Sequence, residues 1–116
     1  MTTKINIPTL YDDLAGSMAA LRTNHSKVER SRAIVEQALN DGQPHYGINT
    51  GFGVLADQSI SRDELGQLQK NILLSHACGV GDPVPMEITR LMLQIKIHSL
   101  GIGQSGISEK TFGLLL

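Results

Sequence analysis

Two Ser-x-x-Glu sequences, each followed by apolar residues at helical spacing, constrain the fold of this chain more than any other feature. Ser-x-x-Glu is the capping-box pattern, in which both side chains satisfy backbone N–H groups at the start of a helix. The first box begins at Ser26, and its apolar pattern continues until Asn40-Asp41-Gly42, which predicts a helix over about 26–40. The second begins at Ser61 and predicts a helix over about 62–78. Both favour a mainly α-helical protein.

Three further helices are predicted from caps and apolar spacing. Thr9 is suited to cap a first helix, and Pro83 and Pro85 suit the entrance of another, whose apolar residues cover more than one side. Ser108 is suited to cap a last helix, which contains Phe112. The chain ends on three leucines with no helix-ending residue after them. We therefore expect it to be part of a longer protein.

The composition excludes several classes of function. The 116 residues carry a formal net charge of −1 at pH 7, so no basic surface for nucleic acid is expected. No stretch approaches the ~20 consecutive apolar residues that cross a membrane. The single Cys78 cannot form an internal disulfide and no signal-peptide pattern is present, which favours a cytoplasmic protein. We expect Cys78 to be a small buried residue, and the spacing of the four histidines predicts no metal site.

The segment 43–60 does not fit the helical pattern. Gly47, Gly51 and Gly53 lie within seven residues, and Tyr46 stands directly before the first of them. Because glycine permits positive φ and a close approach of the backbone to another group, this spacing predicts a shaped loop that is suited to a functional site. Alternatively, the segment is a plain turn in which Tyr46 only fills space. Composition alone leaves both interpretations open.

The sequence of Tyr46–Gly53, YGINTGFG, resembles the tyrosine loop of the aromatic amino-acid ammonia-lyases and aminomutases. A second segment, Asn71–Gly81 (NILLSHACGVG), is similar to the segment that follows this loop in the histidine ammonia-lyase branch of that family. The two motifs stand in the family's order and at its spacing, and the similarity extends from about residue 26 to the C-terminal region. The resemblance implies the N-terminal helical region of an ammonia-lyase-like fold, with 1–116 as a single partial domain and the tyrosine motif in loop 43–60.

The resemblance also implies a chemistry. Enzymes of this family remove ammonia from an amino acid without hydrolysis, with the help of a methylidene-imidazolone (MIO) group that forms from an internal Ala-Ser-Gly. Histidine as substrate would give urocanate. Tyr46 matches the family's catalytic base, a role that requires surroundings that stabilise a phenolate. The active-site loop that the match implies contains, besides this tyrosine, Gly47, Asn49, Thr50, Gly51, Phe52 and Gly53.

Two interpretations of His76 stand side by side. It shares one face of the predicted helix with Leu65, Leu68 and Ile72, which is typical of a histidine at the edge of a core. The resemblance instead implies that His76 binds the substrate, where the family discriminates between side chains. The same Ser-His pair occurs in tyrosine-acting lyases and aminomutases, so tyrosine as substrate and amine migration as outcome stay open.

Ala-Ser-Gly occurs nowhere in these 116 residues. We therefore expect the chain to be the N-terminal part of a histidine ammonia-lyase-like enzyme, inactive by itself, with MIO formed outside it. The resemblance implies a homotetramer that acts on a small amino acid. The alternative is a non-enzymatic helical interaction module that binds a partner through exposed leucine faces.

Overall fold

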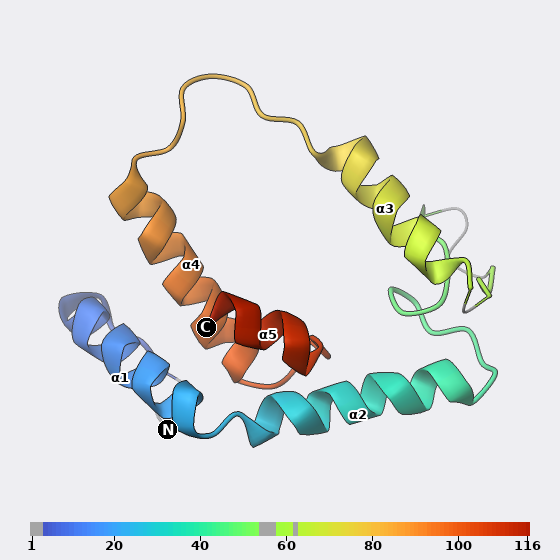
Figure 1. The fold of residues 1–116 in the computed structure, drawn as a ribbon, viewed down its shortest axis with the longest axis horizontal. Coiled ribbons are helices and arrows are strands. Elements are labelled where there is room, and N and C mark those ends of the chain that lie inside the picture. The colour runs from blue at the N-terminus through green and yellow to red at the C-terminus, as the bar shows by residue number, and fades with distance from the viewer. Residues whose placement is uncertain (1–3, 54–57, 62) are drawn as a thin grey trace. The chain divides into compact units, whose positions relative to one another are not determined.

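The computed structural model describes residues 4–53, 58–61 and 63–116, most of which are helical (Figure 1). In chain order the elements are the short 3-10 helix η1 Ile7–Thr9, α1 Leu10–Thr23, α2 Ser26–Asn40, α3 Leu65–His76, α4 Met86–Gly101 and α5 Glu109–Leu115. Within the described ranges, extended pairing is limited to an isolated bridge between Thr50 and Ser59. The prediction of a mainly α-helical protein is confirmed.

The contacts within the chain divide it into two compact units. One unit consists of Met1–Ile34 and Pro83–Leu116, and the other of Val35–Asp82. The first holds α1, α4 and α5, and the second holds α3 and the tyrosine motif. That residues 1–116 belong to a single domain of a longer protein stays a prediction.

The first helix and the last begin close to where they were predicted, with one difference in capping. At α5 the Ser108 hydroxyl accepts a hydrogen bond from the Thr111 N–H at 3.2 Å, as an N-cap does. At α1, Thr9 instead donates its hydroxyl to the Asp13 carboxylate at 2.8 Å. That carboxylate also accepts from the Asn6 backbone N–H at 3.0 Å, and these two bonds lower the pKa of Asp13 below its ordinary value.

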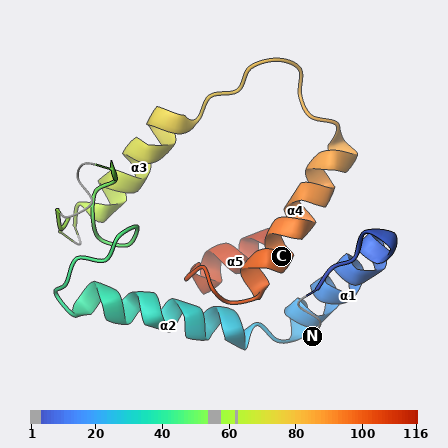
Figure 2. The ribbon, with the colours of Figure 1, turned by 180° about the vertical axis from the view of Figure 1, so that it is seen from behind.

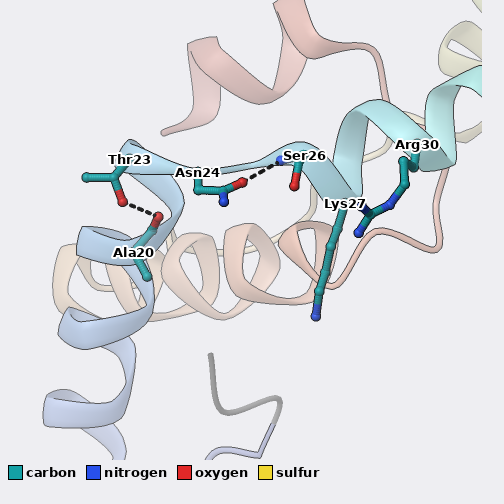
Figure 3. A pocket seen from close by; sticks show the side chains of 6 residues that line it. All are labelled: Ala20, Thr23, Asn24, Ser26, Lys27 and Arg30. Atoms are coloured by element: carbon teal, nitrogen blue, oxygen red, sulfur yellow. Dashed lines mark hydrogen bonds between the residues drawn. The ribbon is translucent and has the colours of Figure 1, made fainter.

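The connection between α1 and α2 differs from the predicted capping box, because α2 begins at Ser26 itself and Ser26 is therefore not its N-cap. Ser26 is already helical, because the His25 carbonyl accepts from the Val28 N–H at 2.8 Å. The Asn24 side chain accepts from the Ser26 N–H at 3.0 Å, and the Thr23 hydroxyl donates to the carbonyl of Ala20 at 2.9 Å. Figure 3 shows both bonds within a pocket of about 290 Å³ whose lining is Ala20, Thr23, Asn24, Ser26, Lys27 and Arg30. These polar groups hold the connection itself.

The α3 helix begins at Leu65, later than its predicted start at Arg62, a residue that lies outside the described ranges. The Ser61 hydroxyl donates to the Glu64 carboxylate at 2.6 Å, while the Ser61 carbonyl accepts from the Glu64 N–H at 3.0 Å. The two side chains of the predicted capping box therefore bond to each other, and a turn forms before the helix. α4 begins directly after Pro85, as predicted.

The hydrophobic core of the first unit lies where α1 packs against α4 and α4 packs against α5 (Figures 1 and 2). It contains Leu21, Val28, Ile97, Leu100 and Phe112. Phe112 has no exposed surface, and partly buried side chains, the last two leucines among them, pack around this cluster. Each helix supplies the apolar residues of one face, which explains why the periodicity predicted these segments.

One buried polar pair was not predicted. The Ser17 hydroxyl of α1 lies 2.7 Å from Nδ1 of His98 on α4, and both residues are buried. Because the two groups bond each other, neither is left unsatisfied in the core. The pair adds a specific link between α1 and α4.

The α4 helix has apolar residues on more than one side, as predicted, and some of them remain exposed. The core takes Ile97 and Leu100, whereas other large apolar side chains of α4 are exposed: Met86, Ile88, Met92, Leu93 and Ile95. Among the described residues, no helix is both long and apolar enough to cross a membrane.

Candidate active site

The turn that leads to Tyr46 begins where α2 ends. Gly42 adopts φ +73°, a conformation that glycine accepts without steric cost. The Asp41 carboxylate then accepts from the Gln43 backbone N–H and from Nε2 of His45, each at 2.8 Å. The backbone bond first and the His45 bond second lower the pKa of Asp41, so its carboxylate is ionised at neutral pH. Asp41 therefore folds the chain back just before Tyr46.

Asn49 holds the other side of the same turn. Only 7% of the surface of Asn49 is exposed. Its Oδ1 accepts from the His45 N–H at 2.7 Å, and its Nδ2 donates to the Gln43 carbonyl at 2.9 Å. The Asn49 N–H also donates to the His45 carbonyl at 3.2 Å. These bonds close a tight turn over residues 43–49, and Tyr46 lies within that turn.

Tyr46 lies at the surface of this turn, with 67% of its surface exposed. Its ring meets the ring of Phe52 edge to face, with centroids 5.9 Å apart and planes at 69°. Such edge-to-face pairs are a favoured aromatic geometry. Gly47 and Gly53 adopt φ +78° and +60°, so glycine is favoured directly after each of the two aromatic residues.

A pocket of about 440 Å³ lies beside this aromatic pair. Its lining combines the glycine-rich segment with one face of α3, namely Gly51, Phe52, Ile60, Leu68, Ile72 and His76. The walls are apolar apart from the imidazole of His76. A mostly apolar pocket with one polar group is typical of a site that binds an aromatic or heteroaromatic ring.

His76 is held by its own helix. Its Nδ1 lies 3.0 Å from the Ile72 carbonyl, which can only accept, so Nδ1 carries a proton and donates. The Ser75 hydroxyl lies 2.8 Å from the same nitrogen and also donates to the Ile72 carbonyl at 3.0 Å. In the neutral imidazole Nε2 is then the nitrogen that can accept a hydrogen bond.

The structure brings together some of the residues that the sequence singled out. Gly51, Phe52 and His76 line the pocket, and Tyr46 adjoins it through its contact with Phe52. The other loop residues, Gly47, Asn49, Thr50 and Gly53, shape the chain between these contacts, while residues 54–57 of the predicted loop lie outside the described residues. His76 is exposed, which disagrees with its interpretation as a core-edge histidine.

Sequence reasoning missed the polar bonds that position Tyr46. The only sequence signal was the turn pattern Asn40-Asp41-Gly42, which predicted a helix end and not the contact with His45. Ile60 was not predicted to line a pocket, because its place depends on the Ile60 N–H donating to the Asn49 carbonyl at 2.8 Å.

The expectation that Cys78 is buried is wrong. Its thiol is exposed in the segment that follows α3. The helix ends at His76, so the apolar face of α3 does not extend to Cys78.

One cluster lies outside this site and was not visible in the sequence spacing. His25 Nε2 lies 3.5 Å from Glu109 Oε1 and 3.9 Å from Glu29 Oε1. His25 Nδ1 lies 3.2 Å from the Leu21 carbonyl, and the ring is 5.9 Å from that of Phe112. The two carboxylates are exposed and form ion pairs with His25 when it is protonated, so the cluster joins α2 and α5 without requiring a metal.

Comparison with known proteins places the chain in a family. Residues 15–116 match the family described as Aromatic amino acid lyase. The chain therefore belongs to the aromatic amino acid lyase family.

Several relatives carry the name histidine ammonia-lyase, and three of them are compared with this chain. The chain is 51% identical over 90 residues to the one from Anaeromyxobacter sp. (strain K), 45% identical over 91 residues to that of Myxococcus xanthus, and 42% identical over 90 residues to that of Deinococcus radiodurans. Each match covers 78% of this chain. The matches cover 18% of the Anaeromyxobacter and Myxococcus proteins and 17% of the Deinococcus protein, so the chain spans under a fifth of the length of these relatives.

Proposed function

We propose that this chain forms the N-terminal part of a carbon–nitrogen lyase that removes ammonia from L-histidine and releases urocanate. The observation that carries this proposal is the pocket in which His76 of α3 meets Phe52 of the tyrosine motif. Family membership and the printed names of the relatives support the same activity. They also favour an enzyme over a helical interaction module.

The residues of this chain would act on the substrate in two ways. Tyr46 contacts Phe52, which lines the pocket, and would take the β-proton of the substrate as a general base. The apolar walls would enclose the substrate ring, and Nε2 of His76 would hydrogen-bond to its polar atom.

The pocket lining fits a substrate ring, because it consists of apolar groups and one imidazole, and offers no group that could build an electrophile. The methylidene-imidazolone, formed from Ala-Ser-Gly outside this chain, would supply that electrophile.

Assembly and location belong to the same proposal. A homo-oligomer, a tetramer as in the family, would cover the large apolar side chains that α4 exposes. A cytoplasmic location is supported by the single cysteine, since disulfides are rare in that compartment.

The Tyr46→Phe substitution tests the role of the base. The test uses a protein that carries this chain followed by the family's Ala-Ser-Gly segment, here termed the extended protein. In it we expect the substitution to lower kcat for histidine by at least ~10²-fold, the typical contribution of a general base. The phenyl ring keeps the edge-to-face contact with Phe52, so the thermal midpoint should not move. Urocanate formation, followed by its ultraviolet absorbance, measures the loss.

The 116-residue chain alone serves as the blank in this assay and is expected to form no urocanate, because it has no Ala-Ser-Gly. Full turnover by the Tyr46→Phe protein would exclude Tyr46 as the base.

The His76→Leu substitution tests substrate choice. If Nε2 of His76 binds the substrate ring, the extended protein should lose roughly tenfold or more of its kcat/KM for histidine relative to that for phenylalanine, because the polar ring would lose its partner. Leu74→Ala, an exposed position on the same helix outside the pocket lining, is the matched control. Equal losses of kcat/KM on both substrates would contradict a contact between His76 and the substrate ring. A preference of the unsubstituted extended protein for tyrosine over histidine would favour the tyrosine-acting alternative.

A further inference from the structure

One buried residue, Asn49, bonds both to the turn that carries Tyr46 and to a residue of the pocket wall. The Asn49 side chain bonds the chain on both sides of Pro44, at Gln43 and His45, so it closes the turn directly before Tyr46. The Asn49 carbonyl accepts from the Ile60 N–H at 2.8 Å, and Ile60 is part of the pocket lining. Asn49 therefore joins the Tyr46 turn to the pocket.

Neighbouring bonds hold this junction in register. Gly51 N–H donates to the Gln58 carbonyl at 3.2 Å, and Thr50 forms the isolated bridge with Ser59. Asn49, Thr50 and Gly51 are all buried, whereas Tyr46 and Phe52 on either side of them are exposed. The buried backbone thus forms a fixed base from which both aromatic rings project.

The side-chain chemistry at this position is demanding. One atom of the buried side chain at position 49 must accept from the His45 N–H, and another must donate to the Gln43 carbonyl. A primary amide meets both requirements, whereas a carboxylate can only accept and an alkyl group does neither. A buried residue whose two bonds end on either side of the same turn fixes the direction in which the turn points.

We propose that Asn49 is a positioning residue, which sets the place of the Tyr46 hydroxyl relative to the pocket of Phe52, Ile60 and His76 through its bonds to Gln43, His45 and Ile60. The proposal rests on the function proposed above for Tyr46. Asn49 itself touches neither substrate nor the reacting atoms; it acts through Tyr46. Small displacements of a catalytic group cost large factors in rate, about 10²-fold for 1 Å.

The test uses Asn49→Ala and Asn49→Asp in the extended protein. Asn49→Ala removes both side-chain bonds, and Asn49→Asp keeps an acceptor for the His45 N–H but sets a carboxylate against the Gln43 carbonyl. We expect kcat to fall about 10- to 100-fold in both variants, with KM changed far less, since the pocket side chains remain.

Ser31→Ala is the matched control for the general effect of losing a buried side-chain bond. The buried Ser31 hydroxyl accepts from the Gly106 N–H at 2.8 Å within the other compact unit, so this variant should lose thermal stability without the fall in kcat.

The double variant Tyr46→Phe/Asn49→Ala separates positioning from a merely structural role. If Asn49 acts through Tyr46, its substitution should add less than about threefold to the loss already caused by Tyr46→Phe. Multiplication of the two losses would overturn the proposal, and so would an unchanged kcat in Asn49→Ala when Tyr46→Phe is impaired. If Tyr46→Phe itself keeps full activity, the proposed base is wrong.

Hydrogen exchange in the 116-residue chain gives a readout that does not depend on activity. Loss of the Asn49 side chain should speed exchange of the His45 amide by at least tenfold while the Gly106 amide is unaffected, and Ser31→Ala should do the reverse. An unchanged His45 amide in Asn49→Ala would show that the side chain does not hold the turn.

Discussion

Phe112→Ala is expected to lower the free energy of unfolding of the 116-residue chain by about 3–5 kcal/mol, the range for removing a buried phenyl ring from a core. Phe112 is fully buried and belongs to the same cluster as Leu21, Val28 and Leu100. The substitution leaves a cavity at the meeting point of α1, α4 and α5 that the surrounding helices fill only in part. Because native domains are stable by only about 5–15 kcal/mol, this loss should be severe.

Urea unfolding followed by far-ultraviolet circular dichroism measures this change, and Leu114→Ala is its control. Leu114 lies in the same helix but is 80% exposed, so its truncation should change the free energy of unfolding by no more than about 0.5 kcal/mol. Similar losses at both positions would show that α5 does not pack as described.

Gly103→Ala is expected to cost about 2–5 kcal/mol, through two effects of a single methyl group. Gly103 adopts φ +82°, where an L-residue with a Cβ is penalised by about 1–2 kcal/mol. A Cβ there would also lie 2.5 Å from the backbone carbonyl oxygen of Lys27, so α2 or the turn after α4 must move, at a typical cost of about 1–3 kcal/mol.

Two other glycines separate these effects in the same unfolding measurement. Gly42 adopts φ +73° with nothing within 4 Å of its ideal Cβ, so Gly42→Ala should show the conformational cost alone. Gly113 lies inside α5, also with open space, and Gly113→Ala should stabilise that helix by about 0.5–1 kcal/mol. A loss at Gly103 no larger than that at Gly42 would contradict the close contact with Lys27.

Local sequence patterns predicted the helices best where their signals act within a few residues. Asn40 ended α2 as predicted, Pro85 preceded α4, and the Ser108 hydroxyl accepts from the Thr111 N–H as an N-cap should. The predicted start of α3 was wrong because Ser61 and Glu64 have an equally local alternative, in which their side chains bond each other. Both arrangements use the same two side chains at the same spacing, so spacing could not distinguish them.

The candidate site was predicted only in part. The order of residues in YGINTGFG and the Ser-His pair singled out Tyr46, Phe52 and His76 through resemblance to a family. Their arrangement around one pocket depends on the pairing of Thr50 with Ser59 and on the place of Ile60, contacts that join segments with no shared periodicity. Likewise, Asn49 was one of several loop residues until its two side-chain bonds were visible.

The sequence by itself therefore determined the helical class, most helix ends and the family resemblance, because periodicity and caps express hydrogen bonds between residues three or four positions apart. Only the tertiary structure decided which apolar faces meet, as in the cluster that contains both Phe112 and Leu21, and which polar groups pair at a distance, as Ser17 does with His98. It also decided that Cys78 is exposed and that Gly103 must be a glycine. Such contacts join residues far apart in the chain, and their energies depend on packing geometry, which no local pattern encodes.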